Sequence, residues 1–439
     1  MRVLRPLRPT RRLALFASLV GLGAASGRPG ALAMATSAPT PWALRAVPAD
    51  EPMRQLQAGG PSGLLGTGAS GRLWALSLQG QAPRRIADGI DPATPIATAH
   101  GRIAARMADG GLWIWEEAGA AGRARATSPS RSAHLSVHAG LLILPSAVLA
   151  VVGASARPAD ALGHRLARFE PDPDGRWRDV ARSTQAVLPD ARPVQVDLDG
   201  RGDGGHIAVL AGPDGNRYDH GVLGDAIEAT RVLWLERHGL EVLRALSLPA
   251  PHVFEDTTTR PVLLPGGRSG RGLLTVRSGP DGGQLALLTA DPARPRSLRL
   301  AALGDTVGGH HRWLAPTTDG QHLAAVHTPH IGGVLHVYQA AGERLTRQRL
   351  HADVSTHHIG TREVDLAAWV QGLLILPSQD GRQLRLLNPA ADWAEWKAVA
   401  LPGRAILTAA VPDAAALAVL LDGGQVVLAA ASPHPPSRG

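Results

Sequence analysis

Histidines are concentrated between residues 310 and 358, and imidazole is the side chain in this sequence that is best suited to chemistry. A seventh candidate, His220, precedes that stretch in the segment RYDHG. Neutral imidazoles bind zinc or copper, and they also donate to carbonyls or accept protons. Because the chain has no H-E-x-x-H motif and no cysteine, hydrogen bonding from loops is favoured over a metal site. The six other candidates are His310, His311, His327, His330, His357 and His358.

The segment RYDHG gathers several reactive side chain types in one short loop. Tyr218, Asp219 and His220 are consecutive, and Asp225 lies five residues after His220. Either carboxylate is placed to orient His220 as a general base. No nucleophile motif such as G-x-S-x-G accompanies them. The alternative is a loop that its own polar contacts hold over a sheet.

Aromatic and cationic residues extend this candidate site. Trp313 follows Arg312, and an indole near a channel mouth can stack on a sugar or an aromatic ligand. The other tryptophans are expected in core packing. The ligand-binding residues predicted from the sequence are Tyr218, Asp219, His220, Asp225, His310, His311, Arg312, Trp313, His330 and His358.

An acidic turn provides a second, weaker candidate. Asp197, Asp199 and Asp203 have the spacing of a calcium loop, in which alternate carboxylates converge on one ion. Arg201 occupies the third ligand position, where a guanidinium neutralises the carboxylates instead of binding metal. The sequence therefore leaves calcium binding open beside a charged hairpin turn, and we expect no other cofactor.

Short apolar runs separated by glycine turns must position these residues. Leu323–Val326 and Gly333–Tyr338 are two such runs, and units like them recur along the chain. The heptapeptide GLLILPS occurs at 140–146 and again at 372–378, where we expect corresponding strands. These features predict an all-β fold, a β-propeller over residues 62–432. Seven blades are expected, with N- and C-terminal strands sharing one blade, and eight are the alternative. A helical turn is considered only near residues 224–235.

The N-terminal residues indicate an exported protein, and the charge of the remaining chain argues against a nucleic-acid partner. Residues 1–33 have a basic start, an apolar run and a small-x-small site, as in a signal peptide. Residues 34–61 are expected to be a linker and residues 433–439 a disordered tail. The formal charge of +8 falls near +2 without the six arginines of residues 1–33, so we expect no nucleic-acid partner. A periplasmic or secreted monomer without a membrane span in the mature chain is predicted.

Several segments resemble a known family. The turn at Asp197 followed by HIAVLAG resembles FG-GAP or VCBS-type repeats, which build propellers such as the integrin alpha head. The blocks RYDHGVLGDAIEA, FEDTTTRPVLL, RWLAP, HLAAVHTPHIGGVLHVY and HHIG resemble exported bacterial VCBS-repeat proteins of unassigned function, over residues 190–400. Turns that carry calcium ligands in that family read Thr318-Asp319-Gly320 and Pro265-Gly266-Gly267 here. The resemblance implies a propeller whose calcium loops are degenerate.

Two functions remain open from the sequence. The favoured one is a non-enzymatic binding or scaffold propeller that engages a protein, peptide or glycan through loops at one face. The alternative is a lyase or hydrolase acting on an extracellular polymer, with His220 or His330 as base, Asp219 nearby and Arg312 stabilising negative charge. The enzyme requires these side chains to converge in one place.

Overall fold

Antiparallel strands account for nearly all regular structure in the described part of the chain. The computed structural model describes residues 42–60, 63–116, 125–127, 134–153, 162–200, 205–264, 271–294 and 296–431. The predicted signal peptide, the start of the predicted linker and the predicted tail lie outside these residues. Residues 42–431 belong to one unit by their contacts, and within the described ranges no helix is long and apolar enough to cross a membrane.

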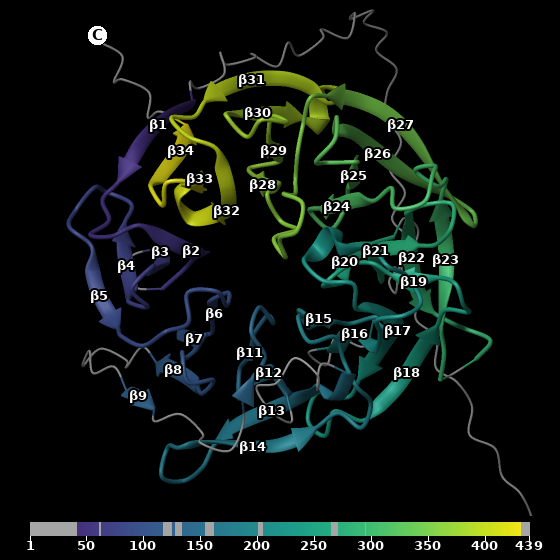
Figure 1. Cartoon of the computed structure of the whole chain (residues 1–439), viewed down its shortest axis with the longest axis horizontal. Coiled ribbons are helices and arrows are strands. Elements are labelled where there is room, and N and C mark those ends of the chain that lie inside the picture. The colour runs from purple at the N-terminus through teal and green to yellow at the C-terminus, as the bar shows by residue number, and fades with distance from the viewer. Residues whose placement is uncertain are drawn as a thin grey trace, which may run out of the picture. The chain divides into compact units, whose positions relative to one another are not determined.

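The strands form successive units of four or five strands, here called blades and numbered along the chain, which follow one another around a ring (Figure 1). Blade 1 contains β2 (Met53–Ala58), β3 (Gly63–Gly68), β4 (Leu73–Ser77) and β5 (Arg84–Ala87). Blade 2 contains β6 (Ala97–Ala99), β7 (Arg102–Arg106), β8 (Leu112–Glu116) and β9 (Arg125–Thr127). Blade 3 contains β10 (His134–Leu135), β11 (Leu142–Leu144), β12 (Ala147–Gly153), β13 (Arg165–Pro171) and β14 (Trp177–Arg182), with β10 and β11 both paired to β12.

Blades 4 to 6 are joined by bridging pairs into one 13-stranded sheet. Blade 4 contains β15 (Val194–Val196), β16 (His206–Asp214), β17 (Glu228–Leu235) and β18 (Val242–Ser247). Blade 5 contains β20 (Arg260–Leu263), β21 (Arg271–Ser278), β22 (Gln284–Ala290) and β23 (Leu298–Gly304), and the short β19 (Val253–Phe254) pairs with both β17 and β21. Blade 6 contains β24 (Leu314–Thr318), β25 (Leu323–His327), β26 (Val334–Ala341) and β27 (Arg344–Ala352).

The last two blades complete the ring. Blade 7 contains β28 (Ala368–Val370), β29 (Leu373–Pro377), β30 (Gln383–Asn388) and β31 (Ala394–Ala400). Blade 8 contains β32 (Ala405–Val411), β33 (Ala416–Leu421), β34 (Val426–Ala431) and, as its outermost strand, β1 (Trp42–Val47). Among the described residues, short 3-10 turns between strands include η2 (Gly221–Leu223), η3 (Pro389–Ala391) and η4 (Pro412–Ala414).

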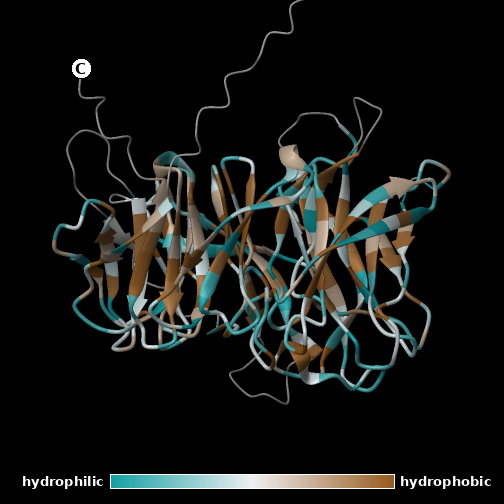
Figure 2. Ribbon diagram, turned by 90° about the horizontal axis from the view of Figure 1, so that it is seen from above, coloured by the Kyte–Doolittle hydropathy of each residue, from teal (hydrophilic) through white to brown (hydrophobic). Residues whose placement is uncertain are grey.

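Packing between neighbouring blades forms the core. One hydrophobic cluster joins blades 1 and 2, and another joins blades 8 and 1. The other clusters bridge the remaining neighbours in the same way. Figure 2 shows apolar residues along the strands and hydrophilic residues in many of the loops at the two ends. Because each blade buries both faces against its neighbours, the strands read as continuous apolar runs.

The structure confirms the all-β propeller and corrects several details. The described strands can be grouped into eight units, seven of four strands and one of five, which matches the alternative of eight blades and not the expected seven. The N- and C-terminal strands do share a blade, through β1 and β34. Trp42–Val47 and Met53–Ala58, expected in a linker, instead form β1 and β2 because their apolar residues pack in the ring.

Two local expectations also differ from the structure. The two GLLILPS segments occupy different positions, since the first contains the inner strand β11 and the second contains β29, the second strand of its blade. Residues 228–235, considered for a helical turn, form the strand β17. The loop before this strand contains one 3-10 turn, η2. An apolar run of that length fits a strand and a helix equally well, and blade packing decides between them.

One glycine is required by close backbone approach. A Cβ on Gly333 would lie 1.9 Å from the carbonyl oxygen of Val354. We expect Gly333→Ala to lower the free energy of unfolding by about 1–3 kcal/mol, because the two backbones must move apart. Urea unfolding measures this, with Gly423→Ala as the control, since a Cβ there meets nothing within 4 Å. Equal stability of the two variants would contradict the observed approach.

Candidate functional site

Two loops bring an aromatic ring and three imidazoles together at one end of blades 4 to 6. The loop between β16 and β17 carries Tyr218 and His220, and the loop between β23 and β24 carries His310 and His311. We call these four residues the histidine rim. The ring centre of Tyr218 lies 5.4 Å from that of His310 and 5.5 Å from that of His311, both edge to face. His220 stacks on His311 at 4.8 Å with planes 6° apart.

A buried carboxylate lies beneath the rim. Glu255 follows β19, and its side chain is 0% exposed. Nδ1 of His220 hydrogen-bonds with Oε1 of Glu255, while the indole N–H of Trp313 donates to the Glu255 carbonyl at 2.9 Å. A hydrogen bond to Nδ1 fixes the orientation of an imidazole and directs Nε2 away from the carboxylate. Glu255 therefore positions His220.

Polar contacts within the first loop explain its shape. Oδ1 of Asp214 accepts from the backbone N–H groups of Asn216 and Arg217, at 2.9 and 3.0 Å, which closes a turn. The guanidinium of Arg217 donates to the carbonyl of Leu248 at 3.0 Å. The apolar pair Val222 and Leu223 is buried. These contacts hold Tyr218 and His220 in place before any ligand binds.

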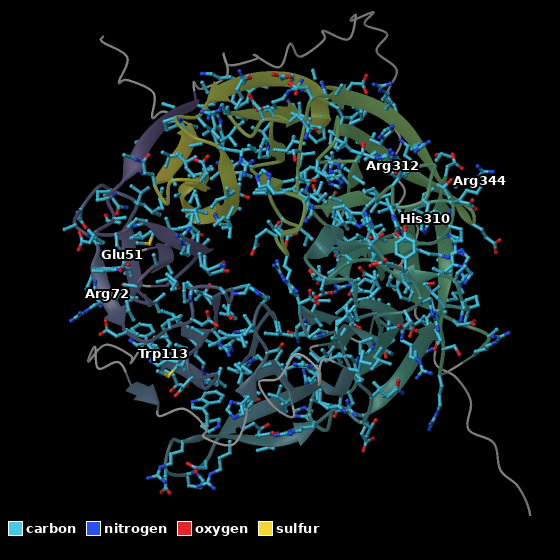
Figure 3. All side chains as sticks on the ribbon, in the orientation of Figure 1. Glu51, Arg72, Trp113, His310, Arg312 and Arg344 are labelled. Carbon is cyan, nitrogen blue, oxygen red and sulfur yellow. The ribbon has the colours of Figure 1, made fainter. Side chains whose placement is uncertain are left out.

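The neighbouring loops add further residues. Trp313 packs edge to face on His357 at 4.9 Å, and His357 lies 6.2 Å from His330. The charges of His220 and Arg312 both act on His330. The backbone N–H of Gly360 donates to the carbonyl of Val222 at 2.9 Å, which joins the β27–β28 loop to the rim loop. Figure 3 places His310 and Arg312 near one another in the part of the ring that contains blades 5 and 6.

Burial controls the charge of the carboxylates in this region. It raises the pKa of Glu255, and the hydrogen bond and positive charge of His220 act against that rise. Burial, followed by the charges of Glu255 and Asp190, raises the pKa of Glu228 well above its ordinary value. Burial raises the pKa of Asp190 to about 6, and the charge of Asp225 adds to that effect. Burial therefore favours the protonated form of Glu228.

Three imidazoles, that of His311 in the rim and those of His330 and His357 beside it, are neutral at neutral pH. Burial lowers the pKa of His311, and the charges of His310 and His220 lower it further. Burial, with His220 and Arg312 as secondary causes, lowers the pKa of His330. Burial also lowers the pKa of His357 to about 4. These three rings therefore act as hydrogen-bonding groups, and Arg312 adds a permanent positive charge near His330.

The raised pKa of Glu228 has a testable effect on stability. The folded protein holds a proton there that the unfolded chain releases above its ordinary pKa of 4.5, so this contribution to stability falls as pH rises through the folded-state pKa. We expect Glu228→Gln to match the wild type near pH 4 and to be more stable at about pH 8, by on the order of 1–3 kcal/mol. Urea unfolding at both pH values measures the difference. A variant that is less stable at the higher pH would show that Glu228 is ionised and well paired.

The structure assigns different surroundings to several predicted residues. Neither aspartate orients His220: Asp219 is exposed, and Asp225 pairs with Arg362 at 2.6 Å. Trp313 is 1% exposed, so it packs in the core and does not offer a stacking surface. Nε2 of His358 lies 2.7 Å from the carbonyl of Ala405, so this ring faces blade 8. The expected orienting role therefore belongs to Glu255, which lies 35 residues after His220 in the sequence.

The calcium prediction lies partly outside the described residues. Asp197 and Asp199 follow β15, and Asp197 is buried, while Asp203 falls in the undescribed segment 201–204. Among the residues that the structure describes, no group of three His, Cys, Asp or Glu side chains is placed to hold a metal ion. Calcium binding at this turn stays a prediction.

A set of ion pairs inside the ring was not expected from the sequence. Arg362 pairs with Asp190 at 3.1 Å as well as with Asp225. Arg192 donates to the carbonyl of Arg362 at 2.8 Å and pairs with Asp365 at 3.3 Å. The chain between β27 and β28 reaches toward the centre of the ring in Figure 1, which allows it to meet residues from blades 3 and 4. In the sequence, the only local sign of this network is that Asp190 lies two residues before Arg192 and that Glu363 and Asp365 follow Arg362.

Comparison with known proteins supports the fold. No protein-family model matches this sequence, and no curated protein sequence matches it. Among solved structures, Sqt1 of Saccharomyces cerevisiae is similar with a TM-score of 0.57 and 10% identity, over 88% of this chain and 97% of that one. The Dos1 propeller gives a TM-score of 0.55 at 12% identity, over 89% of this chain and 95% of that one.

BamB from Moraxella catarrhalis gives a TM-score of 0.51 at 13% identity, over 90% of this chain and 99% of that one. At such low identities the similarity concerns the arrangement of strands and not the residues of a site. The chain is a β-propeller, as the strand pairing and these structures show.

Proposed function

We propose that this propeller is an exported binding protein. It engages a protein or peptide partner through the histidine rim and the two loops beside it, the β25–β26 loop and the β27–β28 loop. The observation that carries the proposal is the exposure of large apolar side chains next to the rim. Ile331 is 52% exposed beside His330, and Ile359 is 65% exposed beside His358. Exposed apolar residues among hydrogen-bonding groups are typical of surfaces that bind other proteins.

The rigidity of the surface supports the same function. His220 is held by Glu255, and the backbone N–H of His311 donates to the Tyr218 hydroxyl at 3.3 Å. A surface ordered before binding loses little conformational entropy when a partner arrives. The burial of Trp313 removes the aromatic platform on which a glycan was expected to stack, so a protein or peptide is favoured over a glycan.

We also propose that the protein is exported, that it is a monomer and that it is related to VCBS-repeat proteins. Residues 1–33 have the pattern of a signal peptide, which supports a periplasmic or secreted location. The turn at Asp197 resembles a VCBS calcium loop in which Arg201 occupies the third ligand position. We propose that it is a structural turn with a degenerate calcium loop.

Peptide selection tests the proposed binding surface. Peptides are selected from a random displayed library on the mature protein, and their dissociation constants are measured by calorimetry. We expect the double variant His311→Ala, Ile359→Ser to weaken binding by about tenfold or more, because it removes one hydrogen-bonding ring and one apolar anchor.

Leu263→Ser is the matched control for this experiment. Leu263 is 50% exposed, and its backbone N–H donates to the carbonyl of Gly320, in the turn after β24. That turn lies at the opposite end of β24 from Arg312 and Trp313. Peptides that bind the rim variant as tightly as the wild type, or that are lost equally with Leu263→Ser, would contradict the proposal.

A specific observation also favours a second candidate, a lyase or hydrolase acting on an extracellular polymer. The Glu255 carboxylate holds His220 by Nδ1, which leaves Nε2 available as a general base. Arg312 lies close enough to His330 for its charge to act on that ring, and a guanidinium there can stabilise a developing anion. Incubation with a panel of polysaccharides tests this candidate. For this candidate we expect the wild type to produce new reducing ends and His220→Gln to produce none. Equal products from both proteins would contradict it.

A further inference from the structure

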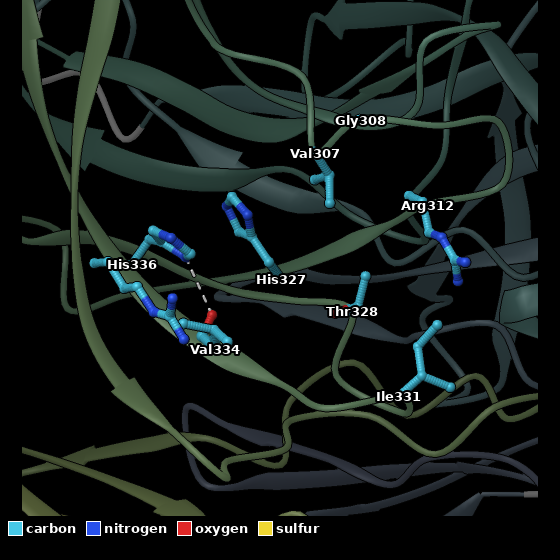
Figure 4. A pocket seen from close by; sticks show the side chains of 9 residues that line it. Val307, Gly308, Arg312, His327, Thr328, Ile331, Val334 and His336 are labelled. Atoms are coloured by element: carbon cyan, nitrogen blue, oxygen red, sulfur yellow. Dashed lines mark hydrogen bonds between the residues drawn. The ribbon is translucent and has the colours of Figure 1, made fainter.

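A separate pocket lies between the β23–β24 loop and strands β25 to β27 of blade 6 (Figure 4). Its volume is about 420 Å³, and its lining includes Val307, Arg312, His327, Ile331, His336 and Arg349. Only Arg312 belongs to the ligand-binding set predicted from the sequence. Apart from Ile331 and Arg312, the lining residues named here are not used by the proposed function.

Two imidazoles form one wall of the pocket. The rings of His327 and His336 stack with centres 3.9 Å apart and planes 28° apart. Nδ1 of His336 lies 3.2 Å from the carbonyl of Val334, the bond drawn in Figure 4. Because a carbonyl oxygen can only accept a hydrogen bond, Nδ1 of His336 carries the proton. Nε2 is then the nitrogen without a proton in the neutral ring. Arg347 donates to Nδ1 of His327 at 3.2 Å, and Nε2 of His327 bonds with the Tyr338 hydroxyl.

Positive charge surrounds these rings without a lining carboxylate. Arg312 lies across the pocket from the two histidines in Figure 4, and Arg349 pairs in register with His336 on the adjacent strand. Among the described residues, neither Arg312 nor Arg349 forms an ion pair. Asp305, the acid of the same loop, pairs instead with Arg344 at 2.8 Å. Two guanidinium groups thus remain available to an anion.

Burial, together with this surplus of positive charge, favours the neutral form of both histidines. Burial, with His336 and Arg347 as secondary causes, lowers the pKa of His327 to about 3. Burial lowers the pKa of His336, and the charges of Arg347 and Arg349 lower it further. An anion in the pocket would offset those charges and would favour a protonated His336.

We propose that this pocket binds a sulfate or phosphate group, with Arg312 and Arg349 as its cationic ligands and His336 as a further donor. Guanidinium groups match the oxygens of such anions by paired hydrogen bonds. The pocket is larger than a single oxyanion, and Val307 and Ile331 supply apolar lining. The natural ligand is therefore a sulfate or phosphate ester with a small organic body.

Binding is coupled to a proton. The groups that face His336 are His327 from β25, Arg347 and Arg349 from β27, and Arg312 from the opposite loop. His336 already donates from Nδ1, so protonation at Nε2 creates a second donor toward the anion. Affinity for an anion of constant charge therefore rises as pH falls toward the ordinary histidine value of 6.5 and below it.

Calorimetric titration of the mature protein with sodium sulfate tests the site. Sulfate keeps its charge across the working pH range, so any proton coupling belongs to the protein. We expect saturable binding above a sodium chloride control of equal ionic strength, weakened about tenfold in Arg349→Gln because one charge-assisted contact is lost. Arg299→Gln, on the exposed outer strand β23, is the matched control and should bind as the wild type does.

Three further arms complete the experiment. Affinity should increase between about pH 7.5 and about pH 5.5 in the wild type, and this increase should disappear in His336→Gln. Phosphate should bind, and acetate should bind at least about tenfold more weakly. No saturable sulfate binding, equal binding by Arg349→Gln, or acetate binding as tight as sulfate would overturn the proposal. Since no peptide is present, failure here leaves the proposed partner binding untouched.

Discussion

Replacing Trp42 with alanine is expected to lower the free energy of unfolding by about 3–5 kcal/mol, the usual cost of removing a buried tryptophan. Trp42 is 4% exposed and begins β1, the strand that closes the ring. It packs in the cluster that joins blades 7 and 8. Its backbone pairs with Ala431 at the other end of the chain, so the substitution weakens closure as well as packing. Urea unfolding followed by tryptophan fluorescence and circular dichroism measures the loss.

Arg45→Ala is the control for this prediction. Arg45 lies on the same strand, opposite Leu428, and is exposed, so its loss should change stability by no more than about 0.5 kcal/mol. If Trp42→Ala were as stable as Arg45→Ala, β1 would not be the strand that completes blade 8.

The second large effect is expected from Arg260→Met. Arg260 pairs with Asp256 at 2.7 Å, and the side chains are 10% and 0% exposed. Removing the guanidinium leaves a buried carboxylate without its counter-ion, which costs about 3–5 kcal/mol. Burial already raises the pKa of Asp256 against the opposing charge of Arg260. Without that charge the pKa rises further, so the deficit should be largest at high pH and should shrink as pH falls and Asp256 takes up a proton.

Two variants separate this effect from general surface electrostatics. Arg344→Met breaks the pair with Asp305, whose side chains are 72% and 56% exposed, and should cost at most about 1 kcal/mol. The double variant Asp256→Asn, Arg260→Met should recover part of the loss, because no buried charge remains. A loss independent of pH, or equal to that of Arg344→Met, would contradict the role assigned to the pair.

The fold was predictable because local patterns specify it. Apolar runs bounded by glycine turns fix strands such as β25 and β26, whose predicted runs overlap the observed elements. The number of blades was harder, since β1 and β2 lie in a stretch rich in alanine and proline that reads as a linker. Only pairing with β34, nearly 400 residues away, shows that Trp42–Val47 is a strand. Such pairing leaves no local signal.

The candidate site was only partly predictable for the same reason. Tyr218 and His220 are neighbours in the sequence, and the concentration of histidines correctly drew attention to His310 and His311. Glu255 was missed because it comes from a different blade and follows the apolar pair Val253–Phe254. A Glu-Asp pair between an apolar strand and three threonines was the available signal, since carboxylates are rarely buried without a partner.

The tautomer of His220 tests the central claim, that Glu255 holds His220 in a preformed rim. Nitrogen-15 NMR of the mature protein labelled in histidine reports which ring nitrogen carries the proton, and the missing signal of His220→Gln assigns the resonance. The predicted result is a proton on Nδ1, hydrogen-bonded to Glu255. A proton on Nε2 with an unprotonated Nδ1 would contradict the account.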